Sequence, residues 1–469
     1  MPENSWLQDD SGDELDPISS LLSDLDEEEF ENEFFFQGLE GRRSKAALVL
    51  TLLWSGTIAL HLVSWGSWFI FGLTGLLGIQ TVRFLLAQPV KTPEPILAGE
   101  PVPYVSLLVA AKNEEFVISN LVRMLCNLDY PASRYEVWVI DDHSTDGTPE
   151  LLDELAEVYP QLKVLHRQEF AGGGKSGALN QVLPLTKGQF VGVFDADAKV
   201  TKDLLRRVLP LFSQPEMGAV QVRKAIANDS QNFWTKGQMA EMAFDSYIQQ
   251  QRIAIGGIGE LRGNGQFMRR VALERCGGWN EETITDDLDL TIRLHLDKWD
   301  IGFLDCPAVE EEGVTTALAL WHQRNRWGEG GYQRYLDYWR LIASNRMGTR
   351  KTLDLFSFMI MQYLLPAAAI PDCLMAIARN RPPILTPLTA LALALPLIGM
   401  YTGLRRYSQE PLTVSNFFVT IWQTLRGTFY MLHWMLMIAS ITARISVRPK
   451  RLKWVKTVHE GSGEESFEF

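Results

Sequence analysis

Residues 190–197 read FVGVFDAD, a short apolar run that ends in two aspartates, Asp195 and Asp197. A run of this length with aromatic and β-branched members predicts a buried strand. The two carboxylates follow it at positions i and i+2, where both can reach one hard divalent cation together with substrate phosphates. Such a pair is common on its own, and the strand before it is what favours a metal site.

Further short apolar runs followed by polar residues occur along residues 104–330. Other apolar runs are found at residues 105–110, 135–140, 162–165 and 219–222. Helical patterns separate them, for example at 115–126 and 203–212. This alternation predicts an α/β domain with a parallel or mostly parallel sheet. Polar residues directly after the runs indicate a ligand site at the carboxyl edge of that sheet.

A second pair of carboxylates, Asp141 and Asp142, ends the run at 135–140 and is followed by HSTDGT. Carboxylates at a strand end can accept hydrogen bonds from a base or a ribose. The same residues also suit a turn followed by a helix cap. The residues alone leave both interpretations open.

A third acidic cluster lies in residues 284–290, which read ITDDLDL. A carboxylate at a loop-to-helix junction, such as Asp287, can serve as a general base. Acidic residues are also favoured at the positive end of a helix dipole without any catalytic role. Adjacent acids can do both, so the two interpretations do not exclude each other.

Residues 323–327 read QRNRW within a segment of amphipathic spacing. Arginine can pair with a diphosphate, and tryptophan can stack on a sugar or an acyl region. The alternative is an interfacial helix with an aromatic anchor.

The glycine run GGGKS at residues 172–176 resembles a phosphate-binding P-loop. That motif requires a glycine at position 169, where this chain has Glu169, so an ATPase of this type is excluded. A flexible run that presents Lys175 to a phosphate remains chemically reasonable.

Two parts of the chain are apolar enough to cross a membrane. The block at 46–86 is long enough for two helices of about 20 residues each, and the basic residues before it favour a cytoplasmic N-terminus. Further apolar blocks lie at 355–378, 383–403 and 415–440. Three spans would place the C-terminus outside, whereas the basic residues from Arg444 onward favour the cytoplasm. The sequence therefore leaves the span number open, with one block in the interface as an alternative.

The charge and cysteine content of the chain argue against nucleic-acid binding, secretion and a zinc or disulfide site. Residues 1–41 hold 14 of the 57 acidic residues and no basic one, which is typical of a solvated, disordered tail. The remaining 43 acidic and 44 basic residues are balanced, so nothing favours nucleic-acid binding. An acidic start also argues against a secretory signal peptide. The four cysteines form no close pair and no zinc pattern, which predicts reduced, buried thiols.

Together these motifs resemble glycosyltransferase family 2, in its membrane-bound branch, and they occur in that family's order over residues 105–327. The resemblance implies a GT-A fold, which is a Rossmann-like α/β nucleotide-sugar domain, inserted between transmembrane helices. The predicted organisation is an acidic disordered tail at 1–41, a transmembrane hairpin at 46–86, the GT-A domain at 101–330, transmembrane or interfacial helices at 355–440, and a basic then acidic cytoplasmic tail at 441–469.

The resemblance also implies roles for single residues. Asp287 corresponds to the catalytic base. The donor side comprises Asp141 and Asp142 at the uridine of a UDP-sugar, Lys175 and Asp195 at the diphosphate, and Gln323, Arg326 and Trp327. The metal ligands are Asp195 and Asp197, for Mg or Mn. The acceptor side comprises Gly263, Asn264, Gly265, Gln266 and Asp286. Asp286 stands where the family usually has glutamate, but the base position is unchanged, so we expect activity to survive.

The mechanism that the resemblance implies is inverting, with one displacement and no covalent enzyme intermediate. The layout is most similar to cyanobacterial enzymes that transfer glucose from UDP-glucose to the free hydroxyl of 1,2-diacylglycerol. This implies a multi-pass protein of the thylakoid or plasma membrane with its catalytic domain on the cytoplasmic side. The alternatives are a processive β-polysaccharide synthase of the cellulose or poly-N-acetylglucosamine type, a non-catalytic nucleotide-sugar-binding scaffold, and a transporter.

Overall fold

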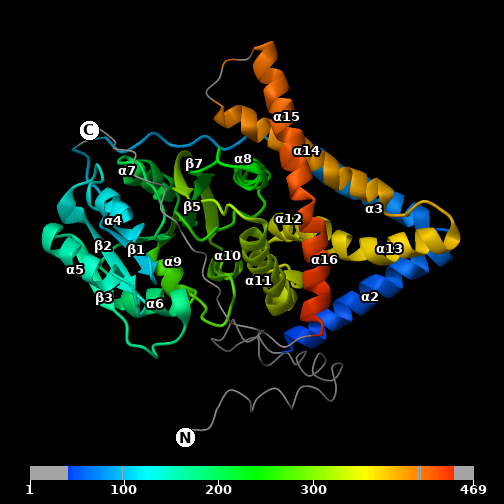
Figure 1. Ribbon diagram of the computed structural model, residues 1–469. Coiled ribbons are helices and arrows are strands. Elements are labelled where there is room, and N and C mark those ends of the chain that lie inside the picture. The colour runs from blue at the N-terminus through cyan, green and yellow to red at the C-terminus, as the bar shows by residue number, and fades with distance from the viewer. Residues whose placement is uncertain (1–40, 98, 409–410, 412, 448–469) are drawn as a thin grey trace, which may run out of the picture.

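The computed structural model describes residues 41–97, 99–408, 411 and 413–447. The predicted tail at 1–41 therefore lies outside the described residues apart from Gly41, whereas residues 441–447 of the predicted tail at 441–469 are described and 441–445 continue a helix. An α/β domain occupies one side of the molecule, and a set of long helices extends from it to the other side (Figure 1).

The α/β domain is built on one mixed seven-stranded sheet of order β3-β2-β1-β4-β6-β5-β7. The strands are β1 Val105–Ala111, β2 Tyr135–Asp141, β3 Leu162–His166, β4 Phe190–Phe194, β5 Met217–Ile226, β6 Gln266–Arg269 and β7 Asp300–Glu311. Strands β1 to β4 are parallel, β6 runs antiparallel to β4 and β5, and β7 is parallel to β5. All five predicted strands are present. Strands β6 and β7 were not predicted, and the antiparallel β6 makes the sheet mixed.

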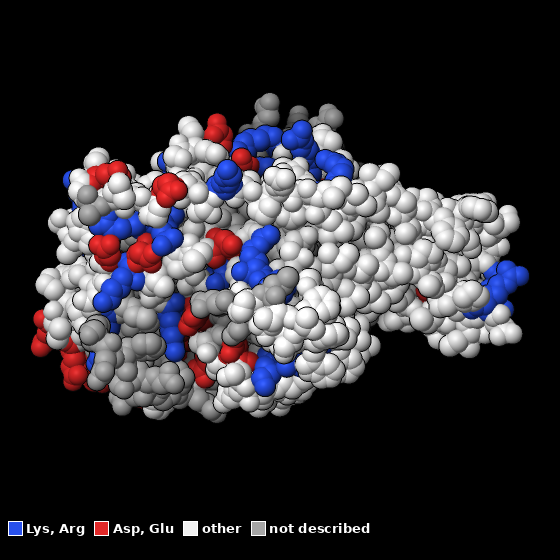
Figure 2. Space-filling model, turned by 90° about the horizontal axis from the view of Figure 1, so that it is seen from above, with Lys and Arg blue, Asp and Glu red and all other residues white. Residues whose placement is uncertain are grey.

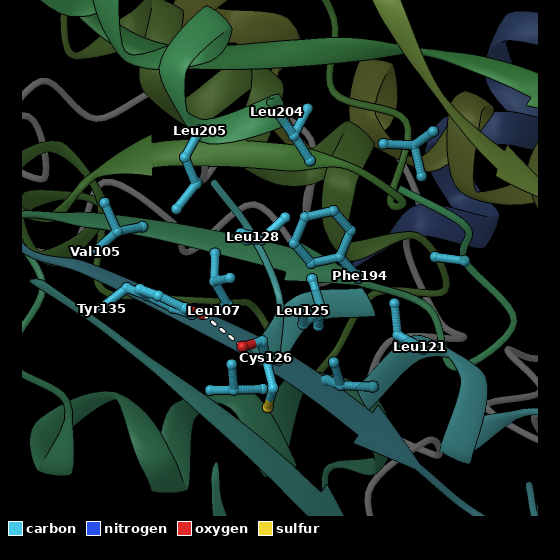
Figure 3. Close-up of a cluster of buried hydrophobic side chains, with 14 of the residues drawn as sticks. Val105, Leu107, Leu121, Leu125, Cys126, Leu128, Tyr135, Phe194, Leu204 and Leu205 are labelled. Carbon is cyan, nitrogen blue, oxygen red and sulfur yellow. Dashed lines mark hydrogen bonds between the residues drawn. The ribbon is translucent and has the colours of Figure 1, made fainter. Parts of the chain in front are cut away.

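Both faces of the sheet are covered, which is why its central strands are almost continuously apolar. The helices between the strands are α4 Ile118–Cys126, α5 Thr148–Val158, α6 Gly174–Val182, α7 Leu204–Val208, α8 Phe233–Ala254, α9 Arg270–Arg275 and α10 Asp286–Leu296. On one face, Leu107 and Phe194 pack with Leu121 and Leu125 of α4 and with Leu204 of α7 (Figure 3). A second core of β1 and β4 residues packs against α6, α9 and α10 on the other face.

The predicted helices at 115–126 and 203–212 are present with shifted bounds. Helix α4 begins three residues later, at Ile118. Helix α7 ends at Val208 and continues as a 3-10 turn over Leu209–Ser213, because Pro210 lacks the amide hydrogen that an α-helix would use there. The segment with the QRNRW motif forms α11, Ala317–Ala343.

Four helices of the described chain are long and apolar enough to cross a membrane: α2 Arg42–Leu62, α3 Gly66–Leu86, the continuous helix Thr349–Arg379, and α14 Thr386–Tyr407. The third of these comprises α12 Thr349–Met359, a π-helical turn η5 Ile360–Leu364, and α13 Leu365–Arg379. The remaining apolar block at 415–440 forms two shorter helices, α15 Val414–Met431 and α16 His433–Ile445. They contact the α/β domain through α8 and α11 and the long helices through α13 and α14.

The long helices form two hairpins that are tied together at their far end. Helices α2 and α3 are joined at residues 63–65, and α13 and α14 at residues 380–385. His61 Nε2 lies 2.7 Å from Asp372 Oδ1. Asp372 also accepts hydrogen bonds from the backbone amides of Ile384 and Leu385. Seen from above, charged side chains gather over the α/β domain and leave the helical part almost bare (Figure 2).

The cysteines are all free thiols. Cys126 and Cys276 are buried as predicted, but the prediction is wrong for Cys306 and Cys373, which are exposed. Cys306 lies at an exposed position of the edge strand β7, and Cys373 lies at an exposed position of α13.

Candidate active site

A cavity of about 610 Å³ lies between the carboxyl ends of the parallel strands and the long helices. It brings together ten of the residues that the sequence analysis singled out: Asp142, Lys175, Asp195, Asp197, Gly263, Asp286, Asp287, Gln323, Arg326 and Trp327. They come from segments up to 185 positions apart in the chain. The edge that was predicted to bind a ligand is therefore one wall of a single shared cavity.

Asp195 and Asp197 leave β4 at its carboxyl end and both line the cavity. The amide of Asp195 donates to Asn264 Oδ1 at 3.2 Å, and Asp195 Oδ1 lies 2.5 Å from Lys175 Nζ. Asp197 Oδ2 accepts a hydrogen bond of 2.9 Å from the amide of Glu312. Two carboxylates held in this way offer only oxygen ligands, which suits a hard divalent cation. The remaining coordination positions of such a cation are filled by oxygens of water or of substrate phosphates. No described group of three or more His, Cys, Asp or Glu side chains is placed to hold a metal ion.

Lys175 reaches the cavity because the chain turns sharply before α6. Gly172, Gly173 and Gly174 all have positive φ, at 64°, 69° and 52°, which glycine adopts without steric cost. A Cβ on Gly173 would also lie only 2.2 Å from a carboxylate oxygen of Glu281. Burial disfavours the charge of Lys175, but the carboxylates of Asp195, Asp286 and Asp287 outweigh it and raise the pKa of this lysine above its ordinary value.

The side chain of Arg167 binds both the carboxylate of Asp142 and the backbone of the glycine run at residues 172–174. The buried Arg167 donates to Asp142 Oδ1 at 2.5 Å and to the carbonyl of Gly172 at 2.7 Å. Lys112, which follows β1, lies 3.9 Å from the other oxygen of Asp142. The end of β2 and the turn before α6 therefore form one connected wall.

Asp286 and Asp287 begin α10 directly after the N-cap residue Thr285, as the sequence analysis expected of a loop-to-helix junction. Asp287 Oδ1 accepts from the amide of Leu288 at 2.8 Å. A Cβ on Gly263, whose φ is +81°, would lie 3.4 Å from Asp287 Oδ2, so the loop between α8 and β6 approaches this carboxylate closely. Asp286 Oδ2 is buried without a hydrogen-bond donor from the described residues.

Burial raises the pKa of Asp287 to about 6, and the neighbouring carboxylate of Asp286 contributes to the shift. A general base must be deprotonated, and a base whose pKa lies near the working pH is also a stronger proton acceptor than an ordinary carboxylate. If Asp287 serves as a base, kcat/KM is expected to fall about tenfold per pH unit below pH 6. An ordinary aspartate would keep the rate flat to about pH 4.

This pH dependence is measured as initial rates between pH 4.5 and 8.5 in a buffer series of constant ionic strength. Preincubation at each pH followed by assay at pH 7.5 shows that the enzyme survives. A rate that stays constant down to pH 4.5 would contradict the assignment of the pKa to the base.

The QRNRW motif is divided between the cavity and the interior. Gln323, Arg326 and Trp327 line the cavity, whereas Arg324 is fully buried. Residues two apart on an α-helix differ in direction by about 200°, so the two arginines cannot face the same side. Arg324 pairs with Glu241 of α8 at 2.5 Å, and its guanidinium lies 4.0 Å from the centre of the Trp327 ring.

A residue of the sheet, Lys224, also contacts the Trp327 ring. Lys224 Nζ of β5 lies 5.4 Å from the Trp327 ring centre and 2.7 Å from Glu311 Oε2. Two cations near one ring give a cation–π contribution of about 0.5–1 kcal/mol each at exposed sites and more when desolvated. The indole is thus a rigid part of the cavity wall.

Four predicted site residues do not line the cavity: Asp141, Asn264, Gly265 and Gln266. Asp141 is buried, accepts from the amide of Ser144 at 3.0 Å, and contacts His166 Nδ1 at 3.0 Å. Asn264 supports the amide of Asp195, and Gln266 begins β6. Their contacts with donor and acceptor remain predictions.

Several charged residues of the cavity were not predicted. Lys112 carries a signal that could have found it, since it follows β1 as Asp141 and Asp142 follow β2. Lys224 and Arg262 carry no such signal. Arg262 lines the cavity and pairs with Glu260 at 2.6 Å and with Asp245 at 2.8 Å.

The mixed α/β sheet has a GT-A-like fold, and its neighbours among known proteins are glycosyltransferases. The model of the family described as "Glycosyltransferase like family 2" matches residues 102–330. Among solved structures, the mannosyltransferase PcManGT from Pyrobaculum calidifontis, in complex with GDP-Man and Mn2+, aligns with a TM-score of 0.53 and 20% identity. The alignment covers 85% of this chain and 98% of that one, and it supports the fold.

Relatives that match nearly the full length of the chain indicate a narrower family. A beta-monoglucosyldiacylglycerol synthase of Nostoc sp. is 63% identical over 99% of this chain and 100% of its own. The enzyme of the same name from Synechocystis sp. is 57% identical over 100% of this chain and 99% of its own. The chain belongs to the beta-monoglucosyldiacylglycerol synthase family, within glycosyltransferase family 2, and it is a glycosyltransferase.

Proposed function

We propose that this glycosyltransferase moves glucose from UDP-glucose to the free hydroxyl of 1,2-diacylglycerol and forms a β-glucoside with inversion. The relatives' shared name supports the product. The observation that carries the proposal is the composition of the cavity, which joins the carboxylates of the α/β domain to apolar residues of the long helices. One cavity thus offers a polar end for a nucleotide sugar and an apolar end for a lipid.

Asp287 acts as the general base in this proposal. It takes the proton of the acceptor hydroxyl while that oxygen attacks the anomeric carbon, and the bond from that carbon to the UDP oxygen breaks. Its raised pKa and its position in the shared cavity support this role. Asp286 has a buried oxygen without a described donor. A hydroxyl of the acceptor can supply the missing hydrogen bond.

The donor diphosphate is proposed to lie between Lys175, Arg326 and the pair Asp195 and Asp197. This pair would hold Mg or Mn, which would neutralise charge on the departing UDP. Lys175 and Arg326 add positive charge at the leaving group. The indole of Trp327, fixed by Arg324 and Lys224, provides a flat apolar surface beside them.

We propose that the four long helices span a membrane and that both ends of the chain lie on the cytoplasmic side with the catalytic domain. An even number of spans resolves the conflict between the three apolar blocks and the basic C-terminal segment, with α15 and α16 in the interface. Basic residues flank the domain-facing ends of all four helices, as expected for the cytoplasmic side: Arg42, Arg43, Lys45, Arg83, Arg350, Lys351, Arg405 and Arg406.

The test supplies purified protein with Mg, 1,2-dioleoylglycerol in mixed micelles and one of three donors: UDP-glucose, UDP-galactose or UDP-N-acetylglucosamine. Thin-layer chromatography of the lipid extract identifies the product. We expect a monoglucosyl lipid with UDP-glucose, cleaved by a β-glucosidase and resistant to an α-glucosidase. A water-soluble polymer without glycolipid would instead identify a polysaccharide synthase.

A further inference from the structure

Beyond the acidic site, the cavity continues between the long helices as an apolar arm. Its walls are formed by side chains of α3, η5, α14 and α16, represented by Leu77, Phe84, Met361, Leu393, Met435 and Ile438. Three of these four elements belong to candidate membrane spans or their turn. An apolar space of this kind offers few hydrogen-bond partners for the hydroxyls of a growing glycan, whose burial there without partners would be costly.

The apolar arm contains a small number of polar side chains, and one of them lacks a partner. Gln362 lines the cavity, and its Oε1 is buried without a hydrogen bond. No hydrogen bond to a described residue fixes which end of this amide faces the arm, so either Oε1 or Nε2 can be presented there. Thr81 of α3 and Thr389 of α14 line the cavity as well.

The sequence explains why Gln362 takes this place. Pro366 has no amide hydrogen, so the carbonyl of Gln362 cannot receive the α-helical bond from four residues on. The chain instead forms the π-helical turn Ile360–Leu364, closed by the amide of Leu365 on the carbonyl of Ile360. Such turns frequently occur at functional sites. Gln362, whose side-chain oxygen is unpaired, therefore lies within the π-helical turn and lines the cavity.

We infer that the apolar arm binds the acyl chains of the lipid acceptor, and that Gln362 hydrogen-bonds its ester region. This inference rests on the proposed function, because it places the body of a lipid whose hydroxyl meets Asp287. Acyl chains match the aliphatic, methionine and phenylalanine lining. When the Gln362 amide is turned so that Nε2 takes the buried position of Oε1, Nε2 can donate to an ester carbonyl, which is an acceptor only. The activity of the enzyme should therefore depend on the acyl-chain length of the acceptor.

Two alanines of α14 provide a matched test. Ala392 lines the cavity, whereas Ala390, two residues away, is exposed and does not. Ala392 lies seven residues from Gly399, which packs against α8 of the catalytic domain. At 1.5 Å per residue this is roughly 10 Å farther from the domain. Ala392→Trp should therefore block the distal part of the arm, and Ala390→Trp should leave it open.

The assay compares 1,2-dioleoylglycerol with 1,2-dioctanoylglycerol for both variants. We expect Ala392→Trp to lower kcat/KM for the long-chain acceptor about tenfold or more, in line with the cost of overfilling a packed space. The short-chain acceptor should change by less than about threefold, and Ala390→Trp should change neither by more than about twofold. Equal effects of the two variants, or equal effects on both acceptors, would overturn the inference.

The wild-type protein provides a second test that does not depend on a variant folding. A diacylglycerol with a diazirine near the end of one acyl chain is photolysed with the protein in micelles, and the labelled peptides are mapped. We expect labels on Met361, Met435 or Ile438, which line the cavity and are not exposed. Labels confined to residues exposed on the outer surface, such as Leu374 and Leu436, would contradict the inference.

Gln362→Leu tests the polar contact. We expect KM for 1,2-dioleoylglycerol to rise about fivefold with kcat nearly unchanged, because a ground-state hydrogen bond is lost. An unchanged KM would remove Gln362 from the site. A wild-type enzyme that glucosylates no diacylglycerol would overturn the proposed function itself. An active enzyme with insensitive variants and unlabelled arm residues would overturn only this inference.

Discussion

Replacing Asp287 by asparagine is expected to lower the rate of glucosyl transfer about a thousandfold, within the 10²–10⁴-fold range that a positioned general base contributes. Asparagine keeps the shape and can still accept the hydrogen bond from the amide of Leu288, but it cannot take a proton. Binding of UDP-glucose should persist or tighten, because one negative charge near the donor diphosphate is removed. Initial rates and isothermal titration with UDP-glucose measure the two effects separately.

The control is Asp297→Asn at the other end of the same helix. Asp297 caps α10 and pairs with Arg275 at 2.8 Å, outside the cavity lining. This substitution should change the rate by less than about twofold, since it touches no site residue. A protein that only binds a nucleotide sugar as a scaffold would retain its cellular role in the Asp287→Asn variant. More than a tenth of wild-type activity in that variant would rule out Asp287 as the base.

The parts of the fold that the sequence predicted are those with a local signal. Strands β1, β2 and β4 are buried on both faces, so they appear as mainly apolar runs, with Ser106 and Glu136 as the polar members before the ends of β1 and β2. Strand β7, Asp300–Glu311, is an edge strand with exposed positions and a proline, and β6 has four residues that begin with a glutamine. Such strands are defined by their partners in the sheet, and their own residues predict nothing regular.

The candidate site shows the same division. Asp195, Asp197 and Asp287 were recognisable because each follows a strand or begins a helix. Helical spacing alone could not distinguish Arg324 from Arg326, because the direction of a side chain on a helix acquires meaning only when the neighbouring helices are known; the family motif is what singled out Arg326. Gln362 gave no signal either, since its importance arises from a cavity formed by helices distant in the sequence. The ionisable residues that a transporter would use within the membrane, of which the last apolar block offers Arg426 and His433, lie in α15 and α16, outside the four candidate spans.

Removal of the divalent cation is the second change with a large expected effect. Carboxylates outnumber cationic side chains along the cavity wall, and Lys175 and Lys224 already pair with Asp195 and Glu311. A diphosphate brought into this surrounding would meet uncompensated negative charge, whose cost in a poorly solvated site is several kcal/mol. EDTA should therefore abolish transfer, and Mg or Mn should restore it.

The metal should act through Asp195 and Asp197, so asparagine at either position should lower the rate about a hundredfold or more and raise the Mg concentration for half-maximal activity. Asp195→Asn has an opposing effect, because it releases Lys175 toward the diphosphate, whereas Asp197→Asn leaves the contact between Lys175 and Asp195 in place. The Asp197 variant should consequently lose more donor affinity than the Asp195 variant at equal Mg. Titration of UDP-glucose into both variants at several Mg concentrations measures this order. Equal activity with and without EDTA, together with unchanged Mg dependence in both variants, would exclude the pair as metal ligands and leave charge neutralisation to Lys175 and Arg326.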